Sequence, residues 1–247
     1  MNERTKKIIT GGVVAVLVGL AIFGIATLAR QRANEQVDSR EIQEAVDQNG
    51  DIGDHVKGNM ASSVILVKYG DFQCPACAPA SVRVQDLMEE YGDRVALIFR
   101  NFPLQGMQNS RAAAAAAEAA GLQGKYWEMH SLIFSKQREW SGSSVQRREE
   151  QFRSYAEELG LNIDQFNADF ASNRVVRKIN FDARLGSQDG VSGTPFFVLN
   201  GRVLSSQEWG NDSRLRQILD EEIANVGGVN NNNNDDNNSA SDDADQD

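Results

Sequence analysis

Cysteine is almost absent from this chain of 247 residues, which has two, Cys74 and Cys77. Histidine is equally scarce, and His55 and His130 lie apart from each other and from the cysteines in the sequence. A structural zinc site needs four ligands, so we do not expect the cysteines to form half of one. Basic residues are outnumbered, with 25 Lys and Arg against 35 Asp and Glu. This balance argues against nucleic-acid binding. We expect no metal, cofactor or nucleic-acid partner.

The two cysteines form the sequence Cys74-Pro75-Ala76-Cys77, between an apolar run at 64–69 and a helical pattern. The apolar run is typical of a buried strand. Residues three apart on a helix have Cα atoms about 5 Å apart, a separation that a disulfide can bridge. We therefore predict a disulfide that opens and closes in place. A purely structural disulfide is disfavoured, because closing so short a loop constrains the unfolded chain little.

The predicted helix start makes the two cysteines unequal. Unpaired backbone N–H groups and the positive end of the helix dipole stabilise a thiolate over a thiol there. Cys74 is nearer the end, so we predict it as the nucleophile and Cys77 as the resolving thiol. Pro75 suits a first helical turn, where its missing N–H costs nothing.

A run of 22 residues without charge, Ile8 to Ala29, precedes these features. As a helix it would span about 33 Å, enough for a bilayer. It exceeds the apolar region of about 7–15 residues in a signal peptide, which favours an uncleaved anchor. Residues 27–29 could still serve as a cleavage site. Arg4, Lys6 and Lys7 place the N-terminus in the cytoplasm and the rest outside, where a dithiol can cycle through a disulfide.

The remaining pattern alternates strands with helices. A strand run at 95–99 is followed by about 80 residues that show helical patterns and no strand pattern. The last of these predicted helices covers residues 166–185. Two strand runs then flank Asn200-Gly201, a strong hairpin signal, before a final amphipathic helix. Residues 38–48 are predicted to be helical within a polar spacer, and the Asn- and Asp-rich residues from 227 on to be disordered.

Five separated blocks of the sequence resemble the DsbA-like thiol-disulfide oxidoreductases, across about residues 54–226. They are DHVKGN at 54–59, GDFQCPAC at 70–77, FRNFPL at 99–104, GKYWEMH at 124–130 and GTPFFVLNG at 193–201. The resemblance implies an α/β chain with a thioredoxin-like fold and an inserted helical domain, preceded here by one N-terminal transmembrane helix.

The expected divisions of the chain combine this resemblance with the apolar run, the charges beside it and the composition of the ends. They are 1–7 (cytoplasmic N-terminus), 8–29 (transmembrane anchor), 30–60 (polar spacer), 61–104 (first half of the thioredoxin-like domain, with CPAC), 105–186 (helical insertion), 187–226 (second half, with the Thr-Pro loop) and 227–247 (disordered tail).

The resemblance also implies roles for residues outside the cysteine motif. Thr194-Pro195 matches the cis-proline element that faces the dithiol and offers backbone groups to a client chain. Two positions depart from the family pattern. Ala76 stands where well-known oxidising members have a His that helps to hold the thiolate. Lys68 stands where many relatives carry a buried Glu. A cation favours a thiolate, whereas loss of the His disfavours it, and a surface-exposed Lys68 is the alternative.

We therefore expect a membrane-anchored, extracytoplasmic thiol-disulfide oxidoreductase that oxidises exported client proteins through Cys74 and Cys77. A membrane redox partner would recycle the dithiol, and the chain is expected to be monomeric. A disulfide reductase or isomerase is the nearest alternative. A client-binding module with a static disulfide and a redox sensor for a single partner are two others.

Overall fold

A five-stranded mixed sheet forms the centre of the part of the chain that the computed structural model describes, residues 37–235. Its strands are β1 (Val56–Gly58), β2 (Ile65–Gly70), β3 (Ala96–Asn101), β4 (Phe196–Leu199) and β5 (Arg202–Leu204). The strand order is β1-β3-β2-β4-β5, with β2 parallel to β3 and antiparallel to β4. The strand that leads into the cysteines is therefore the middle strand of the sheet.

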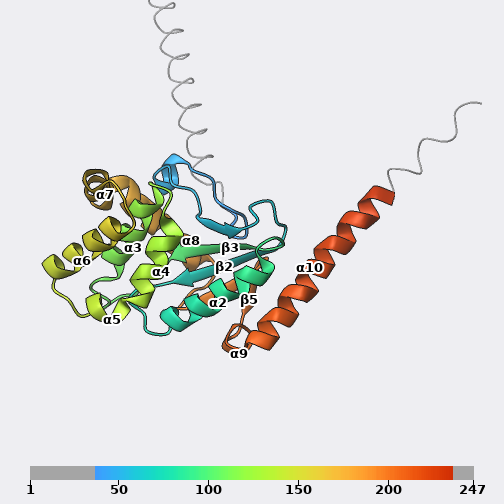
Figure 1. Ribbon diagram of the computed structural model, residues 1–247. Coiled ribbons are helices and arrows are strands. Elements are labelled where there is room, and N and C mark those ends of the chain that lie inside the picture. Colours follow the sequence, from blue (N-terminus) through green and yellow to red (C-terminus); the bar gives the residue numbers. More distant parts are fainter. Residues whose placement is uncertain (1–36, 236–247) are drawn as a thin grey trace, which may run out of the picture. The chain divides into compact units, whose positions relative to one another are not determined.

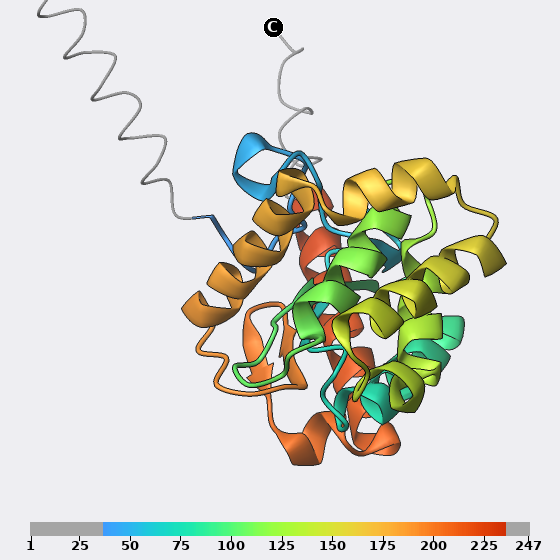
Figure 2. The ribbon, with the colours of Figure 1, turned by 90° about the vertical axis from the view of Figure 1, so that its left-hand side faces the viewer.

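Helices connect and cover the strands (Figure 1). Helix α2 (Cys77–Tyr91) joins β2 to β3, and α9 (Ser206–Trp209) and α10 (Asp212–Asp235) follow β5. A helical insertion separates β3 from β4. It consists of α3 (Ser110–Gly121), α4 (Tyr126–Ser135), α5 (Gln137–Trp140), α6 (Val145–Glu158), α7 (Ile163–Phe170) and α8 (Asn173–Gln188). In Figure 2 the insertion faces the viewer and α10, in red, lies behind it.

The two faces of the sheet carry different chemistry, because successive side chains of a strand point to opposite faces. Lys68 is paired in register with Phe99 of β3 and Phe197 of β4, on the face that α2 and α10 cover with an apolar cluster. Tyr69 is paired with Arg100 and points to the other face, against α8. Lys68 therefore lies on the same side of the sheet as the helix that begins at Cys77.

The predicted hairpin is confirmed, and the last predicted helical stretch is divided. Asn200 and Gly201 have φ values of 45° and 82°, the positive values that a type I′ turn needs. Residues 166–185 form parts of α7 and α8 instead of one helix. The break occurs because the Ser172 side chain accepts a hydrogen bond from the backbone N–H of Val175, 3.3 Å away, and so caps the start of α8.

The predicted polar spacer is wrong for residues 39–60, which are part of the folded unit. The helix predicted over 38–48 is also wrong: the chain there is irregular up to the short 3-10 helix η1 (Asp47–Asn49). The guanidinium of Arg100 donates hydrogen bonds to the carbonyl oxygens of Ser39 and of Glu41, the latter at 2.8 Å. These bonds hold the segment against the sheet.

A buried ion cluster explains why this segment is polar. The Asp54 carboxylate lies 2.7 Å from the Arg100 guanidinium and 2.9 Å from the Lys178 ammonium, which is 2.8 Å from Asp182. Burial alone would raise the pKa of Asp54, but the charges of Lys178 and Arg100 hold it well below its ordinary value. The acidic residues of the predicted spacer thus include one that neutralises buried cations.

The C-terminal prediction needs a correction as well. Helix α10 continues to Asp235, so disorder from residue 227 is wrong for residues 227–235. Extending a helix that has already formed adds a hydrogen bond for each residue fixed, which offsets a weak helical propensity. Residues 236–247 and the predicted anchor at 8–29 lie outside the described residues. No helix within residues 37–235 is long and apolar enough to cross a membrane.

The ion cluster yields a prediction for stability. Asp54→Ala should lower the free energy of unfolding by about 3–5 kcal/mol, because removing one partner leaves buried cations without it. The matched control is Asp93→Ala, since Asp93 is exposed and pairs with the exposed Arg94. The control should change stability by less than about 0.5 kcal/mol. Urea unfolding measures both, and equal effects would refute the importance of the cluster.

Candidate active site

Asp71 organises the turn that joins β2 to the cysteines. Its buried carboxylate accepts hydrogen bonds from the backbone N–H groups of Gln73 at 2.7 Å and of Leu104 at 2.8 Å. The backbone N–H of Cys74 donates to the Asp71 carbonyl oxygen at 3.1 Å. Cys74 is therefore fixed relative to both β2 and the segment that follows β3.

The two cysteines differ in access. Cys77 is the first residue of α2 and Cys74 lies in the turn before it, so only Cys77 is within the helix. Both are free thiols. Cys74 is 6% exposed and Cys77 is 0% exposed, so an attacking group from outside can reach only Cys74. Pro75 and Ala76 form the exposed tip between them.

The loop before β4 lies against Cys74. The Cys74 thiol donates a hydrogen bond to the carbonyl oxygen of Thr194 at 3.3 Å, across 120 positions of sequence. The Thr194–Pro195 peptide bond is cis, as the family resemblance implied. The structure thus brings together Cys74, Thr194 and Pro195 as expected.

The surroundings favour a thiolate at Cys74. The hydrogen bond from the Cys77 thiol is the largest cause, and it lowers the pKa of Cys74 to about 5 against the opposing effect of burial. The backbone N–H groups of Cys77 and Ala76 contribute in the same direction. The same hydrogen bond and burial raise the pKa of Cys77 far above its ordinary value. A low pKa at Cys74 therefore does not need the His that Ala76 replaces.

Lys68 is buried under the dithiol, so a surface-exposed position is wrong. Its ammonium donates to the Cys77 carbonyl oxygen at 3.2 Å and to the Ser81 hydroxyl. Burial lowers the pKa of Lys68 to about 8, although the charges of Cys77 and Cys74 act in the opposite direction. No carboxylate is hydrogen-bonded to its ammonium among the bonds of the described residues. Lys68 is thus a buried ammonium without a carboxylate in these hydrogen bonds, and the two sulfurs are its acidic neighbours.

Two glutamines join the cysteine turn to the helical insertion, Gln73 in the turn and Gln137 in α5. The Gln137 side chain donates to the carbonyl oxygens of Phe72 at 2.7 Å and of Cys74 at 2.9 Å. The Gln73 side chain donates to the Ser141 carbonyl oxygen at 2.7 Å. Glutamine is common on surfaces, and only the tertiary arrangement brings α5 to this turn. No pattern in the sequence could have identified these contacts.

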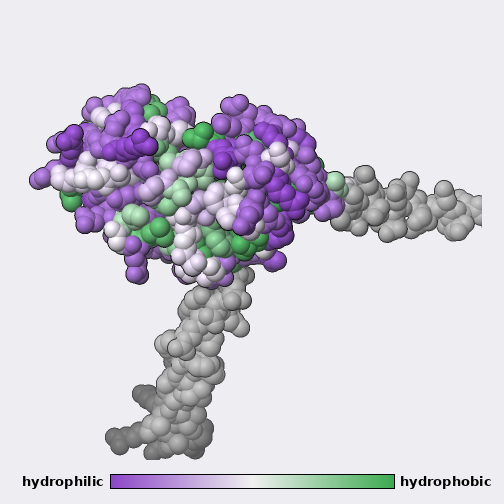
Figure 3. Space-filling model, turned by 90° about the horizontal axis from the view of Figure 1, so that it is seen from below, coloured by the Kyte–Doolittle hydropathy of each residue, from purple (hydrophilic) through white to green (hydrophobic). Residues whose placement is uncertain are grey.

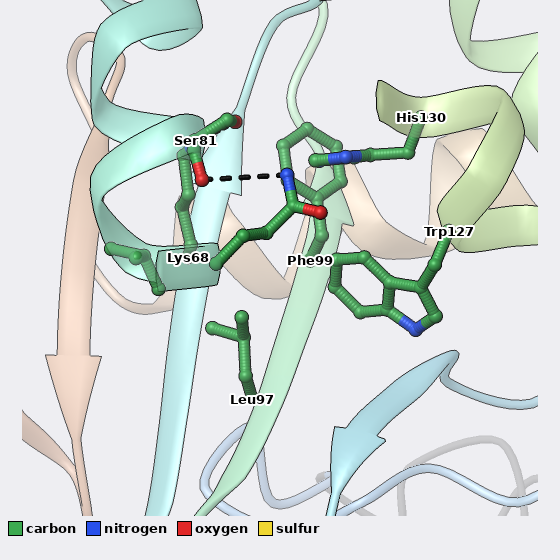
Figure 4. Close-up of a pocket in the computed structure, with 8 residues that line it drawn as sticks. Lys68, Ser81, Leu97, Phe99, Trp127 and His130 are labelled. Carbon is green, nitrogen blue, oxygen red and sulfur yellow. Dashed lines mark hydrogen bonds between the residues drawn. The ribbon is translucent and has the colours of Figure 1, made fainter. Parts of the chain in front are cut away.

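His130 is distant from the cysteines in the sequence, yet it packs beside the residues that lead to them. It is 1% exposed, and its ring packs against Phe72 and Phe99 with centroid distances of 5.4 and 4.8 Å. Figure 4 shows it projecting from α4 towards the Lys68 side of the sheet. His130 is therefore part of the layer directly behind the cysteines. Among the described residues there is no group of three or more His, Cys, Asp or Glu that could hold a metal ion.

A central strand that leads into two thiols, with a cis-proline loop beside the first of them, defines the class of thiol-disulfide oxidoreductases with a thioredoxin fold. The comparisons agree, since the family described as thioredoxin matches residues 50–221. The chain belongs to the DsbA-like branch of this family.

Solved structures support this assignment. A thioredoxin-like oxidoreductase from Silicibacter pomeroyi is 29% identical, with a TM-score of 0.57 over 71% of this chain and 96% of that one. The thiol-disulfide exchange protein alpha-DsbA2 from Wolbachia pipientis is 27% identical, with a TM-score of 0.58 over 71% and 90%. BdbD from Bacillus subtilis, 18% identical with a TM-score of 0.61 over 74% and 98%, shares the fold.

Curated relatives match only over a part of their length. A Na(+)/H(+) antiporter NhaA 1 from Salinispora arenicola is 38% identical over 150 residues, which is 60% of this chain and 22% of the antiporter. An NhaA from Herminiimonas arsenicoxydans is 31% identical over 82% of this chain and 31% of its own length. The chain thus spans less than a third of these proteins, and their names carry no activity over to it.

The Cys77 hydrogen bond gives a prediction for thiolate formation. In the reduced protein, Cys74 should titrate with a midpoint near pH 5, because its pKa is lowered to about 5. Cys77→Ala removes the donor and should raise the midpoint, whereas Cys77→Ser keeps a hydroxyl donor and should raise it less. Thiolate absorbance in the ultraviolet measures all three proteins. Equal midpoints for the two variants would contradict the assigned cause.

Lys68 gives a prediction for the pH dependence of stability. Its pKa falls from 10.5 to about 8 on folding, so between these values the unfolded chain binds more protons. The free energy of unfolding should therefore rise with pH across this window. Lys68→Met lacks this rise and should be about 2 kcal/mol more stable at pH 7, after allowance for the lost hydrogen bonds.

The control for Lys68 is Lys125→Met, at a half-exposed lysine that pairs with Glu128. It should follow the wild-type pH dependence. Urea unfolding of the reduced proteins at several pH values compares them. A Lys68→Met protein whose stability differs from the wild type by a constant amount at all pH values would contradict the argument.

Proposed function

We propose that this chain is a membrane-anchored extracytoplasmic oxidase, which introduces disulfides into exported proteins. The observation that carries the proposal is the lowered pKa of Cys74, to about 5. A stabilised thiolate makes the reduced form of the protein more stable, so the disulfide form is a stronger oxidant. The membership of the DsbA-like family supports the same chemistry.

The proposed reaction begins with the Cys74–Cys77 disulfide. A client thiolate attacks the Cys74 sulfur, the bond between the two cysteines breaks, and Cys77 leaves with the electron pair. A second client thiolate then attacks the client sulfur of the mixed disulfide, and Cys74 leaves as the thiolate. The client loses two electrons and the dithiol gains them. The difference in exposure between the two thiols supports this order, since only Cys74 can be reached from outside.

The client chain is proposed to lie along the loop that contains Pro195. The Thr194 carbonyl oxygen is within 3.3 Å of the Cys74 sulfur, so a backbone beside this loop would bring a client cysteine to the reactive atom. Figure 3 shows the face seen from below, where weakly polar and apolar residues gather in the middle with hydrophilic residues around them. Apolar residues gathered on a surface are typical of sites that bind other proteins.

The proposed location of the dithiol is outside the cytoplasm. Residues 8–29 would anchor the chain with the N-terminus in the cytoplasm and the dithiol outside. A membrane redox partner would reoxidise the dithiol, and the chain would act as a monomer. A reductase or isomerase would use the same two thiols with the opposite net flow of electrons. A static client-binding module would not need free thiols, and the reactive arrangement of Cys74 argues against it.

Trapping of client adducts tests the proposed function. Cys77→Ser expressed in the full chain should accumulate mixed disulfides, formed when the Cys74 thiolate attacks a disulfide of an exported protein, because Cys77 is no longer present to attack the Cys74 sulfur and release the client. The matched variant, Cys74→Ser, should accumulate few, since Cys77 is buried. Non-reducing electrophoresis followed by mass spectrometry of the released partners measures both. Absence of adducts through Cys74, or adducts restricted to cytoplasmic proteins, would refute the proposal.

A further inference from the structure

The cysteine turn and helix α5 are joined at both ends of the helix. Gln137 is the first residue of α5, and its amide nitrogen donates to the carbonyl oxygens of Phe72 at 2.7 Å and of Cys74 at 2.9 Å. Gln73 of the turn donates to the carbonyl oxygen of Ser141, which directly follows α5, at 2.7 Å. Each element therefore holds the other through a half-buried glutamine.

Helix α5 is itself fixed to the rest of the insertion. Trp140 is 0% exposed, and its indole N–H donates to the Ile133 carbonyl oxygen of α4 at 2.8 Å. The Asn109 side chain donates to the Trp140 carbonyl oxygen at 3.2 Å, and the Asn109 backbone N–H donates to the Gln73 side chain at 2.8 Å. These contacts hold the Gln137 amide in one place beside the turn.

The carbonyl oxygen that Gln137 contacts competes with the reactive sulfur for one donor. The backbone N–H of Cys77 lies 3.1 Å from the Cys74 carbonyl oxygen. The same N–H is one of the groups that lower the pKa of Cys74. Hydrogen bonds weaken as they depart from a straight geometry, so one N–H cannot serve both acceptors fully. Gln137 supplies a second donor to the carbonyl oxygen, which keeps a partner when the N–H turns to the sulfur.

This competition matters most in the reduced protein. A hydrogen bond to a charged acceptor is roughly twice as strong as one between neutral groups. The Cys74 thiolate therefore gains from the Cys77 N–H, whereas the sulfur of a disulfide carries no charge. The S–S bond also closes the turn covalently, so the oxidised turn depends less on its hydrogen bonds. A donor that satisfies the Cys74 carbonyl oxygen thus favours the reduced form.

We propose that Gln137 is a positioning residue that makes the Cys74–Cys77 disulfide a stronger oxidant, because its amide satisfies the Cys74 carbonyl oxygen and leaves the Cys77 N–H to the thiolate. The inference rests on the proposed function, since it concerns the direction of the same exchange. Gln137 neither bonds to sulfur nor moves a proton. The helical insertion thus contributes to the redox equilibrium of the dithiol.

The equilibrium with glutathione defines the quantity that changes. Two glutathione thiols supply two electrons and become one glutathione disulfide, while the protein S–S bond breaks. Of their two protons, one goes to Cys77 and one to solvent, and Cys74 remains a thiolate. Any group that stabilises the reduced form more than the oxidised form raises the equilibrium constant for this reaction.

The experiment compares the wild type and Gln137→Met as full chains in glutathione buffers of fixed ratio. Methionine keeps an unbranched side chain of similar length but has no amide. The equilibrium constant for reduction should fall about tenfold, which lowers the potential by about 30 mV. The titration midpoint of the Cys74 thiolate should rise in parallel. Quenching with an alkylating agent and counting the alkylated thiols by mass spectrometry measures the reduced fraction.

Urea unfolding of both redox forms separates this role from simple packing. If the substitution leaves the unfolded chain unchanged, a tenfold shift in the redox equilibrium requires a matching difference between the two forms. Gln137→Met should therefore increase the unfolding constant of the reduced protein about tenfold more than that of the oxidised protein. An equal increase in both forms would overturn the proposal, because Gln137 would then support only the fold.

The matched control is Gln123→Met. Gln123 is a half-buried glutamine after α3 that donates to the Asn162 carbonyl oxygen at 3.1 Å and accepts from the Asn162 backbone N–H at 2.9 Å. It should lose stability equally in both forms and keep the wild-type potential. A wild-type potential in Gln137→Met, or an equal shift in Gln123→Met, would overturn the inference and leave the proposed function intact. A strongly reducing wild type would refute the proposed function, while the shift in Gln137→Met would remain measurable.

Discussion

The hydrogen bond from Cys77 to the Cys74 sulfur is the interaction on which the chemistry of this protein depends. It makes two chemically identical thiols unequal, lowering the pKa of Cys74 and raising that of Cys77. The bond exists only while the turn between the cysteines keeps its shape. Asp71, directly after β2, accepts a hydrogen bond from the backbone N–H of Cys74, and Gln137 of the helical insertion donates one to the Cys74 carbonyl oxygen. The Thr194 carbonyl oxygen, in the loop before β4, accepts a hydrogen bond from the Cys74 thiol. The insertion is thus part of the active-site architecture.

Buried cations have different partners on the two faces of the sheet. Arg100 and Lys178 lie among carboxylates, with Asp54 in contact with both, so their charges are compensated. Lys68, one position before Tyr69 on the same strand, has thiol sulfurs nearby and no carboxylate in the hydrogen bonds described for it. Carboxylates hold the Lys178 ammonium in its charged form, whereas Lys68 has only the two sulfurs as acidic neighbours and its pKa is lowered to about 8. This contrast explains why the lysine under the dithiol is suited to a functional role.

Much of the fold was predictable because its signals are local. The strand runs, the hairpin at Asn200-Gly201 and the helix after the cysteines each follow from short patterns. Residues 39–60 were misjudged because their polar side chains satisfy partners that are distant in sequence, as Asp54 does for Arg100. The cysteines and Pro195 could be identified from motif and resemblance. Gln137 and His130 could not, since their importance arises only from where α5 and α4 pack.

Stabilisation of the Cys74 thiolate is proposed to make the disulfide form an oxidant. The most direct test is the equilibrium of the dithiol with glutathione at fixed ratios of its reduced and oxidised forms, which gives the reduction potential. We expect a value above about −200 mV, on the oxidising side of the glutaredoxins. A value at or below about −270 mV, where thioredoxin lies, would contradict it.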